Sequence, residues 1–333
     1  SGAKLSVEES KSFERLTKTK FTIDYLSLKN LEELRSFFIQ SKNETYNTIL
    51  LDLEEKYIKN IIEQIKYNTE QIFFNVSEPS NNLRKTACAG NLLHTYPSKA
   101  MFTDSIAQFL VEKKWTKVLM LTGPLSFDKE YSDSFKSSAD KFGLRVLQEK
   151  FFVDNNDPRI RDKNDLSFLT MEKKYNVIFV SDINGEFALK VPFNSNKPAV
   201  VTGSAGLTPK TWHWSYLRHG APQLNGRFER MHQRRMSSRD WAAWMAVKVI
   251  IESVLRTKTT ANREILNYIR DSDIRVDGSK GIGLNFRSET NQLRQTIFLV
   301  SGNNWVSGVA PFESFKNKTN DLDTLGILSN SCN

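Results

Sequence analysis

The stretch from Leu92 to Gly123, LLHTYPSKAMFTDSIAQFLVEKKWTKVLMLTG, passes from a turn into a helix and then into a strand. Ser98 can cap the helix. The apolar residues of this helix recur at helical spacing, at Met101, Phe102, Ile106, Phe109 and Leu110. The run Lys117–Thr122 then has the pattern of a buried strand, which ends at Gly123. A helix followed by a short apolar strand is typical of a βαβ unit.

The same alternation of helices and strands extends along the chain in both directions. Strands are predicted at 21–26, 48–52, 71–76, 117–122, 145–152, 176–180 and 199–202, with late strands near 284–286, 295–300 and 305–309. Helices are predicted at 28–40, 56–65, 98–114, 129–142 and 237–256. Short apolar strands separated by amphipathic helices indicate an α/β fold with a parallel sheet. A chain of 333 residues is long enough for two such lobes.

Composition and motifs narrow the function classes. Hydrophobic residues make up 39% of the chain and charged residues 26%, an ordinary globular balance. The sequence holds no HExxH, Walker A or GxSxG motif and no metal-ligand spacing of cysteines. We therefore expect neither an enzyme nor a catalytic cofactor or metal. The net charge of +9 fits either plain solubility or an anionic ligand, and no nucleic-acid-binding signature accompanies it.

The two cysteines, Cys88 and Cys332, lie far apart in the sequence. They are either two lone buried thiols or a disulfide that ties the C-terminus to the body of the protein. A disulfide requires an oxidising compartment. We predict the disulfide.

Several segments occur in an order that resembles the type I periplasmic binding proteins of branched-chain amino-acid transport. Within that family, the chain is most similar to the substrate-binding proteins associated with pyrroloquinoline-quinone-dependent alcohol dehydrogenase systems. The resemblance covers most of the chain from residue 83 onward. It rests on Cys88–Ser98, Val200–Leu207, Gln223–Arg230, Asp240–Trp244, Leu293–Gln295 and Leu322–Gly326.

The resemblance implies two Rossmann-like lobes with parallel sheets, joined by crossover strands. The first lobe is expected from 1–95 and about 223–290, and the second from 96–222 and about 291–333. Residues 1–10 resemble the first helix of the family, not its first strand. We therefore expect the first lobe to lack that strand or to fill its place with another segment.

The resemblance also implies a function. Such proteins are exported to the periplasm, bind a small solute between their lobes by hinge closure, and deliver it to the membrane permease of an ABC transporter. We expect a monomer that binds a small anionic or aromatic solute, with pyrroloquinoline quinone favoured and an alcohol dehydrogenase system as a further partner. Amino-acid uptake and a partner-docking module that binds no solute remain alternatives.

Ligand contacts are expected from loops that follow predicted strands, because ligands of open α/β sheets bind at the carboxyl ends of strands. Phe127 stands where the wider family often carries a ligand-facing tyrosine. Each of these residues also has a structural alternative, such as helix capping, loop stabilisation or core packing. The candidates are Asp52, Ser77, Ser80 and Arg84 in the first lobe and Phe127, Lys129, Asp182 and Ser204 in the second.

The segment from Lys210 to Arg218 is unusual because it crowds two tryptophans, a histidine, a tyrosine and two cations into one loop. Planar aromatic anions stack on indole rings and pair with guanidinium groups. Trp212, Trp214 and Arg227 are therefore candidate contacts for a planar tricarboxylate such as pyrroloquinoline quinone. The alternative is an aromatic cluster that packs the lobes.

Overall fold

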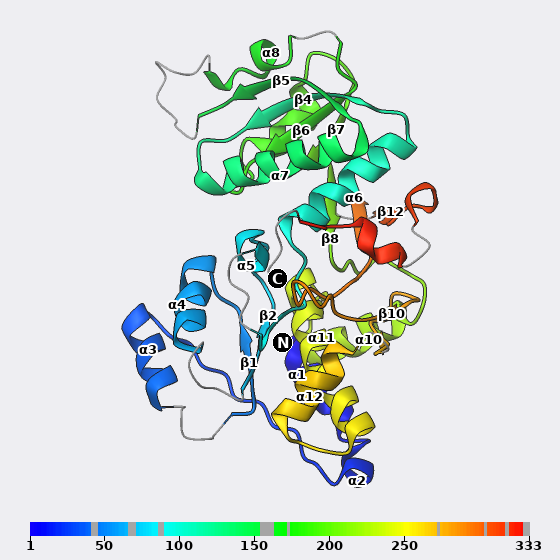
Figure 1. The fold of residues 1–333 in the computed structure, drawn as a ribbon. Coiled ribbons are helices and arrows are strands. Elements are labelled where there is room, and N and C mark those ends of the chain that lie inside the picture. The colour runs from blue at the N-terminus through cyan, green and yellow to red at the C-terminus, as the bar shows by residue number, and fades with distance from the viewer. Residues whose placement is uncertain are drawn as a thin grey trace. The chain divides into compact units, whose positions relative to one another are not determined.

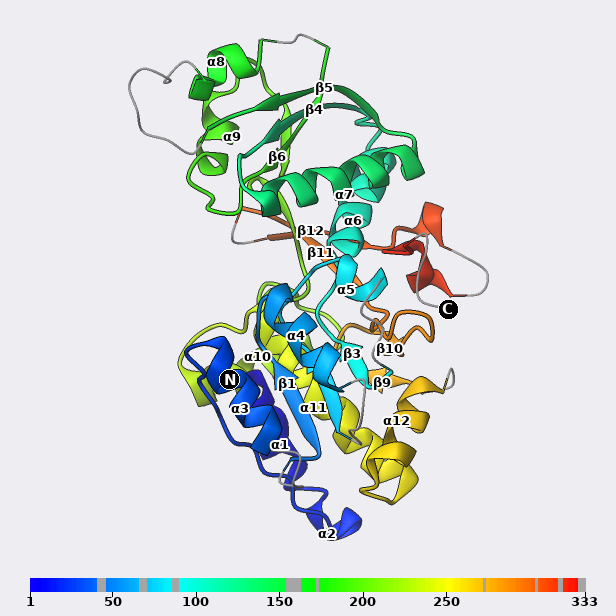
Figure 2. The ribbon, with the colours of Figure 1, turned by 60° about the vertical axis from the view of Figure 1, so that its left-hand side comes forward.

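The computed structural model describes residues 1–40, 46–65, 71–85, 90–153, 163–171, 174–271, 274–302, 305–316 and 320–328. The chain divides into two units (Figures 1 and 2). Unit 1 includes Ser1–Ser98 and Thr211–Gln295, and unit 2 consists of Lys99–Lys210 and Thr296–Ile327. Cys88 and Cys332 lie outside the described residues. No helix in the described part of the chain is both long and apolar enough to span a membrane.

Unit 1 is built on a parallel sheet in the order β1-β2-β3. Its strands are β1 (Thr48–Leu51), β2 (Ile72–Asn75), β3 (Leu92–His94) and the antiparallel pair β9 (Val276–Asp277) and β10 (Gly283–Leu284). Its helices are α1 (Gly2–Ser10), α2 (Glu14–Thr17), α3 (Leu31–Gln40), α4 (Glu55–Ile65), α5 (Asn82–Lys85), α10 (Ala221–His232), α11 (Ser238–Thr257) and α12 (Asn262–Arg270).

Helices cover both faces of the unit 1 sheet because successive strand residues point to opposite sides. Leu51 of β1 packs with Leu34 of α3 and Ile58 of α4. The neighbouring Leu50 faces the other way and packs with Ala3 of α1 and Val247 of α11. The result is a three-layer unit with the sheet in the middle.

The predicted strand at 21–26 is wrong, because residues 19–29 form no strand in the structure. Phe21 and Ile23 instead pack their side chains beside α1 and α11. Alternation of apolar residues predicts which side chains are buried, but a strand also needs a hydrogen-bonding neighbour. No strand precedes Thr48 in the described residues of unit 1, as the family resemblance implied.

Unit 2 has a seven-stranded sheet in the order β12-β11-β8-β7-β6-β4-β5. Strands β4 to β8 run parallel, and β11 and β12 run antiparallel to their neighbours. The strands are β4 (Lys117–Thr122), β5 (Arg145–Phe151), β6 (Val177–Ser181), β7 (Val200–Gly203), β8 (Leu207–Lys210), β11 (Ile297–Ser301) and β12 (Trp305–Ala310). The helices are α6 (Lys99–Glu112), α7 (Ser126–Phe142), α8 (Leu166–Leu169), η3 (Ala188–Lys190), α9 (Val191–Asn194), η4 (Glu313–Phe315) and η5 (Asp321–Thr324).

Strand β4 shows how its alternating residues build the two cores of unit 2. Met120 packs with Ile106 of α6 and Phe135 of α7. Leu121, the next residue, packs on the other face with Leu166 of α8 and Val191 of α9. The predicted strands at 117–122, 145–152, 176–180 and 199–202 are confirmed here to within one residue at each end.

The unit boundaries fall after Ser98, Lys210 and Gln295, whereas the sequence placed them near 95, 222 and 290. The difference at the second boundary has a physical cause. The backbone N–H of Trp212 donates to Ser238 Oγ of α11 at 3.2 Å, and its ring stacks on Trp241 with the centroids 6.1 Å apart. These contacts hold 211–222 in unit 1.

Candidate functional site

The carboxyl ends of β1, β2 and β3 meet at one edge of unit 1, because the three strands are parallel. Asn75, the last residue of β2, organises the loop that follows. Its Oδ1 accepts hydrogen bonds from the N–H groups of Ser77 and Glu78, and its Nδ2 donates to the Glu78 carbonyl oxygen at 2.8 Å. The loop is therefore held in one shape by a buried side chain.

Arg84 of α5 fastens the same loop to its surroundings. Its guanidinium donates to the carbonyl oxygens of Glu78, Ser80 and Tyr96 and to Gln292 Oε1, at 2.6 to 3.0 Å. The residue is 1% exposed, and burial lowers the pKa of Arg84 to about 9. The Arg84 guanidinium thus holds this loop in place within unit 1. Its role as a ligand contact stays a prediction.

His94 ends β3 and lies beside Asn75, with Nδ1 3.0 Å from Asn75 Nδ2. The amide nitrogen is the donor, because Asn75 Oδ1 already accepts two backbone N–H groups. Nδ1 of the ring is therefore unprotonated. Burial, with Arg84 nearby, holds the pKa of His94 well below its usual value, so this histidine is neutral near pH 7.

The two predicted serines of unit 1 are both buried. Ser80 Oγ accepts from the N–H groups of Asn82 and Leu83 and so caps α5. Ser77 lies between Asn75 and Glu78 in the ordered loop. Asp52, which follows β1, is exposed. Of the four residues predicted in this lobe, Asp52 is the one whose side chain is open to solvent.

Tyr96 and Arg239 were missed by the sequence analysis. They come from segments that meet, because Thr95 Oγ1 donates to the Ala242 carbonyl oxygen of α11 at 2.9 Å. Tyr96 follows β3, and burial raises the pKa of its hydroxyl. The positive charge of Arg239 lowers this pKa, while the negative charges of Glu78 and Asp52 raise it. Each of these three charged side chains is therefore within electrostatic range of the Tyr96 hydroxyl. Tyr96 could have been predicted from its position directly after a strand. Arg239 could not, because it lies in a helix more than a hundred residues further along the chain.

In unit 2, Asp128 holds together the loops at the carboxyl ends of β4 and β6. It is 1% exposed and accepts from the N–H groups of Leu125 and Ile183. Ser181 Oγ donates to the Asp128 carbonyl oxygen at 2.8 Å. Gly123 is required beside it, because a Cβ at this position would lie 2.4 Å from Asp128 Oδ2.

Asp182 and Ser204, both predicted as ligand contacts, stabilise neighbouring loops. Asp182 Oδ2 accepts from the N–H groups of Phe187 and Ala188 at 3.0 and 2.9 Å. Ser204 Oγ accepts from the N–H of Asp182 at 2.9 Å. The structure thus brings the Ser204 hydroxyl to the backbone of Asp182, and these bonds use the hydroxyl oxygen and one carboxylate oxygen.

Phe127 and Lys129 lie in the first turn of α7. The ammonium of Lys99, the first residue of α6, lies 4.0 Å from the centre of the Phe127 ring. Lys99 is buried and also pairs with Glu130. Phe127 is half-buried and Lys129 is exposed. Lys99 is the residue that the sequence analysis missed here, although its position directly after Pro97-Ser98 marked the start of a helix.

Trp212, Trp214 and Arg227 lie in unit 1 but have different surroundings. Trp212 is 2% exposed, and its Nε1–H donates to Asn225 Oδ1 at 2.9 Å. Trp214 is half-buried, with the guanidinium of Arg235 3.5 Å from its ring centre. Arg227, on α10, pairs with Glu9 of α1 at 2.6 Å. The structure thus places Trp212 in the core and Trp214 at the surface.

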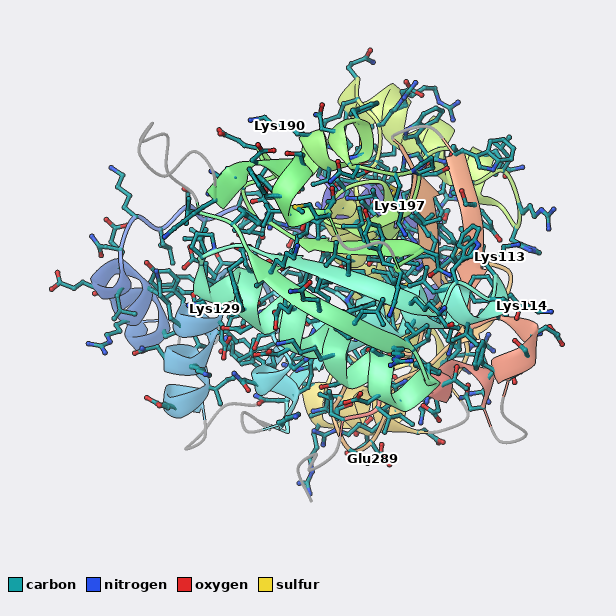
Figure 3. All side chains as sticks on the ribbon, turned by 90° about the horizontal axis from the view of Figure 1, so that it is seen from above. Lys113, Lys114, Lys129, Lys190, Lys197 and Glu289 are labelled. Atoms are coloured by element: carbon teal, nitrogen blue, oxygen red, sulfur yellow. The ribbon has the colours of Figure 1, made fainter. Side chains whose placement is uncertain are left out.

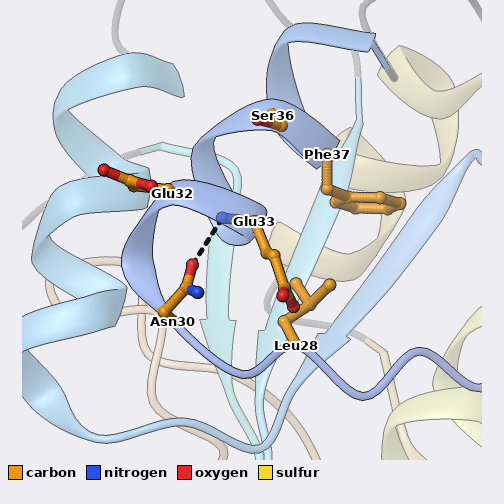
Figure 4. A pocket seen from close by; sticks show the side chains of 6 residues that line it. All are labelled: Leu28, Asn30, Glu32, Glu33, Ser36 and Phe37. Atoms are coloured by element: carbon orange, nitrogen blue, oxygen red, sulfur yellow. Dashed lines mark hydrogen bonds between the residues drawn. The ribbon is translucent and has the colours of Figure 1, made fainter.

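Surface hollows and clusters of metal-ligating side chains are the other common kinds of site. A hollow beside α3 is lined by Leu28, Asn30, Glu32, Glu33, Ser36 and Phe37 (Figure 4). Asn30 Oδ1 accepts from the N–H of Glu33 there and so stabilises the start of α3. The described residues contain no cluster of histidine, cysteine and carboxylate side chains able to hold a metal ion. Neither feature adds a site to those at the strand ends.

No family model and no curated protein matches the sequence. Solved structures do match the fold. An ABC transporter substrate-binding protein from Desulfitobacterium hafniense is 13% identical, with a TM-score of 0.75 over 91% of this chain and 93% of its own. A solute-binding protein from R. palustris in complex with benzoate is 12% identical, with a TM-score of 0.68 over 93% and 91%. A branched-chain amino acid transporter substrate-binding protein from Streptococcus pneumoniae in complex with isoleucine is 12% identical, with a TM-score of 0.70 over 92% of each chain.

These matches cover nearly the whole of both chains in each pair. The chain therefore has the two-unit α/β fold of type I periplasmic binding proteins. At 10 to 13% identity the likeness shows the fold and not the ligand. The structures that match are named as binding proteins, not as enzymes.

Proposed function

We propose that the protein is the periplasmic substrate-binding component of an ABC transporter, that it makes and breaks no covalent bond, and that it captures a small solute with a carboxylate group. The observation that carries the proposal is the match of the whole chain to substrate-binding proteins. In support of it, the loops at the strand ends of both units are held in one shape by buried side chains. Preformed loops of this kind reduce the entropy lost on binding.

The carboxylate follows from the chemistry at the unit 1 edge. Arg239 supplies a guanidinium and Tyr96 a hydroxyl, within electrostatic range of each other. In unit 2, the half-buried Phe127 ring offers an aromatic wall, and the exposed Lys129 of the same helix turn offers a cation. Pyrroloquinoline quinone, a planar tricarboxylate, suits the groups of each unit taken by itself and is the solute suggested by the sequence resemblance.

An amino acid is the second candidate, and the matched structures that contain leucine and isoleucine favour it. Its carboxylate would bind Arg239 in the same way, and Asp52 would then receive the ammonium group. The two candidates therefore differ in what they require of Asp52. A planar tricarboxylate has no use for an exposed acid, whereas an amino acid needs one.

Isothermal titration with pyrroloquinoline quinone, benzoate, leucine and isoleucine tests the proposal. A ligand at about 100 times its Kd also adds about 2.7 kcal/mol to stability, which a thermal melt detects. We expect Arg239→Gln to weaken binding of the true ligand about tenfold or more, since it removes a charge-assisted hydrogen bond. Asp52→Asn should weaken an amino acid and leave the quinone unaffected.

Arg218→Gln is the matched control, because it removes an exposed arginine of unit 1 that lies outside the proposed site. Equal losses in Arg218→Gln and Arg239→Gln would show that only net charge matters. If none of the four compounds binds or shifts the melt, the solute class is wrong. A partner-docking role without a solute then becomes the better proposal.

A further inference from the structure

The positive charge of this protein is concentrated in one segment of unit 1. Between Thr211 and Arg239 there are six arginines and one acid, Glu229, so this segment alone carries +5 of the chain's net +9. All its cations are arginines; it contains no lysine. The segment comprises the end of one crossover, helix α10 and the start of α11.

Contacts within unit 1 hold several of these arginines in fixed positions. Arg234 makes two parallel hydrogen bonds to Asp240, Nη1 to Oδ2 at 2.6 Å and Nη2 to Oδ1 at 2.7 Å. This pair clamps the turn between α10 and α11. Arg235, the next residue, stacks its guanidinium on the ring of Trp214 at 3.5 Å. The cations are therefore presented in defined orientations.

Three arginines of this segment face solvent. Arg230, Arg235 and Arg239 are exposed, and within the described part of the chain none of them takes part in an ion pair with a carboxylate. They lie within ten residues of one another in the sequence: Arg230 precedes the Arg234–Asp240 pair, and Arg235 and Arg239 lie between its two members. We call Arg230, Arg235, Arg239 and Trp214 the arginine surface.

Helix stability does not account for Arg239 in the arginine surface. Arg239 lies in the first turn of α11, where the helix dipole favours an acid and disfavours a cation. Sequence features that work against local stability are often retained for function.

We propose that the arginine surface is a docking site for an acidic region of a partner protein. Guanidinium groups in this segment already bind protein carboxylates twice, in Arg227–Glu9 and Arg234–Asp240. Arginine and tryptophan are the residue types that contribute most at protein interfaces. Leu217 is the single large apolar side chain of the segment that is exposed, so little is available to insert into a lipid bilayer. This proposal shares Arg239 with the proposed carboxylate site, but it does not depend on which solute binds there, and Arg230 and Arg235 belong to the arginine surface alone.

The test uses the full chain and a labelled peptide of about twelve residues, rich in Glu with Gly between, as the probe. The triple variant R230Q/R235Q/R239Q removes the exposed cations of the surface. The matched control, K113Q/K114Q/K117Q, removes three exposed lysines of unit 2, two of which are labelled in Figure 3. Both variants have the same net charge. Fluorescence anisotropy at about 0.02 M and 0.15 M salt gives the affinities.

We expect the arginine variant to bind the peptide about tenfold or more weakly than the wild type, and the lysine variant to stay within about twofold. Equal weakening of the two variants would falsify the proposal, because net charge alone would then explain the binding. Vesicles with about 30% anionic phosphatidylglycerol are the second probe. Binding to vesicles without binding to the peptide would overturn the protein partner in favour of a membrane surface.

A conservative variant separates geometry from charge. R230K/R235K/R239K keeps the charge but loses the planar fork that matches a carboxylate. We expect it to lose about threefold or more in affinity for the peptide, and full binding would contradict a geometric role. Thermal melts check that each variant folds. If the triple variant does not fold, the affinity of the single variant R235Q for the peptide is compared with that of the wild type instead.

Discussion

The strand-end loops of the two units are held by buried charges of opposite sign. In unit 1 the Arg84 guanidinium donates to three backbone carbonyl oxygens. In unit 2 the Asp128 carboxylate accepts from two backbone N–H groups. Each residue is 1% exposed. A buried charge is tolerated when the backbone supplies the partners that water would supply.

This comparison distinguishes residues whose side chains hold the strand-end loops in one conformation from residues whose side chains remain available to a ligand. Arg84, Ser80 and Asp182 have their side chains committed to loop or helix backbone. The exposed Asp52 and Lys129 do not have such roles in the described hydrogen-bond network. The shaping residues should therefore affect stability first and binding only through the shape of the loops.

The largest effect is expected from Arg84→Leu. This change leaves the carbonyl oxygens of Glu78, Ser80 and Tyr96 without their donor in a buried site, at a cost of about 3 to 5 kcal/mol. Urea unfolding followed by tryptophan fluorescence measures it well, because Trp212, Trp214, Trp241 and Trp244 all lie in unit 1. Arg218→Gln, at an exposed position, should change stability by less than about 0.5 kcal/mol. Equal losses of stability from the two changes would contradict the role of Arg84 in holding this loop in place.

Asp128→Asn is expected to have the next largest effect. An amide can accept from one of the two N–H groups, but its NH₂ group then faces the other. We expect a loss of about 1 to 3 kcal/mol in the unfolding free energy. Hydrogen exchange gives a local readout, since the amides of Leu125 and Ile183 should exchange faster while those of β1 to β3 do not change. Unchanged exchange at both amides would show that Asp128 does not hold these loops.

The third prediction concerns pH. The pKa of His94 in the folded protein is lowered well below 6.5 by burial, so below about pH 6.5 the unfolded chain binds a proton that the folded protein does not. His94 therefore contributes full stability above that pH, and the contribution is lost as the pH falls. The loss approaches about 1.4 kcal/mol per pH unit. Urea unfolding between pH 8 and pH 5 should show this slope in the wild type.

His94→Gln is the variant for that measurement, because its side chain does not titrate. Its stability should depend less on pH than that of the wild type in this interval. A wild type and variant with parallel pH profiles would mean that His94 has an ordinary pKa. The edge of unit 1 would then be more open to water than its burial indicates.

The smallest expected effect is that of Ser80→Ala, which removes the cap of α5. Its hydroxyl serves two N–H groups of that short helix, and loss of a cap costs about 1 kcal/mol. Urea unfolding measures the loss. Ser126→Ala provides the comparison in unit 2, at an exposed position where α7 receives no side-chain cap from this serine. If the two substitutions have the same effect, Ser80 is not acting as a cap.

The amino-acid sequence by itself determined the α/β class and the positions of the main strands and helices. Residues such as Met120 and Leu121 carry this information locally, because alternation along a strand decides which face each side chain enters. It also located strand-end loops that the structure confirms as ordered. Local spacing was not sufficient for 21–26, where a strand pattern lacks a pairing neighbour.

Only the tertiary structure decided what the candidate side chains do. Arg84 was predicted from its distance to a strand, but its partner Gln292 lies 208 residues further on. Arg239 acts on Tyr96 because the segment after β3 meets α11, where Thr95 donates to Ala242. Trp212 is buried beside Trp241. Periodicity describes one element at a time, whereas burial and hydrogen bonding depend on which elements meet. The tertiary structure therefore decides which candidate residues hold loops in place and which remain exposed.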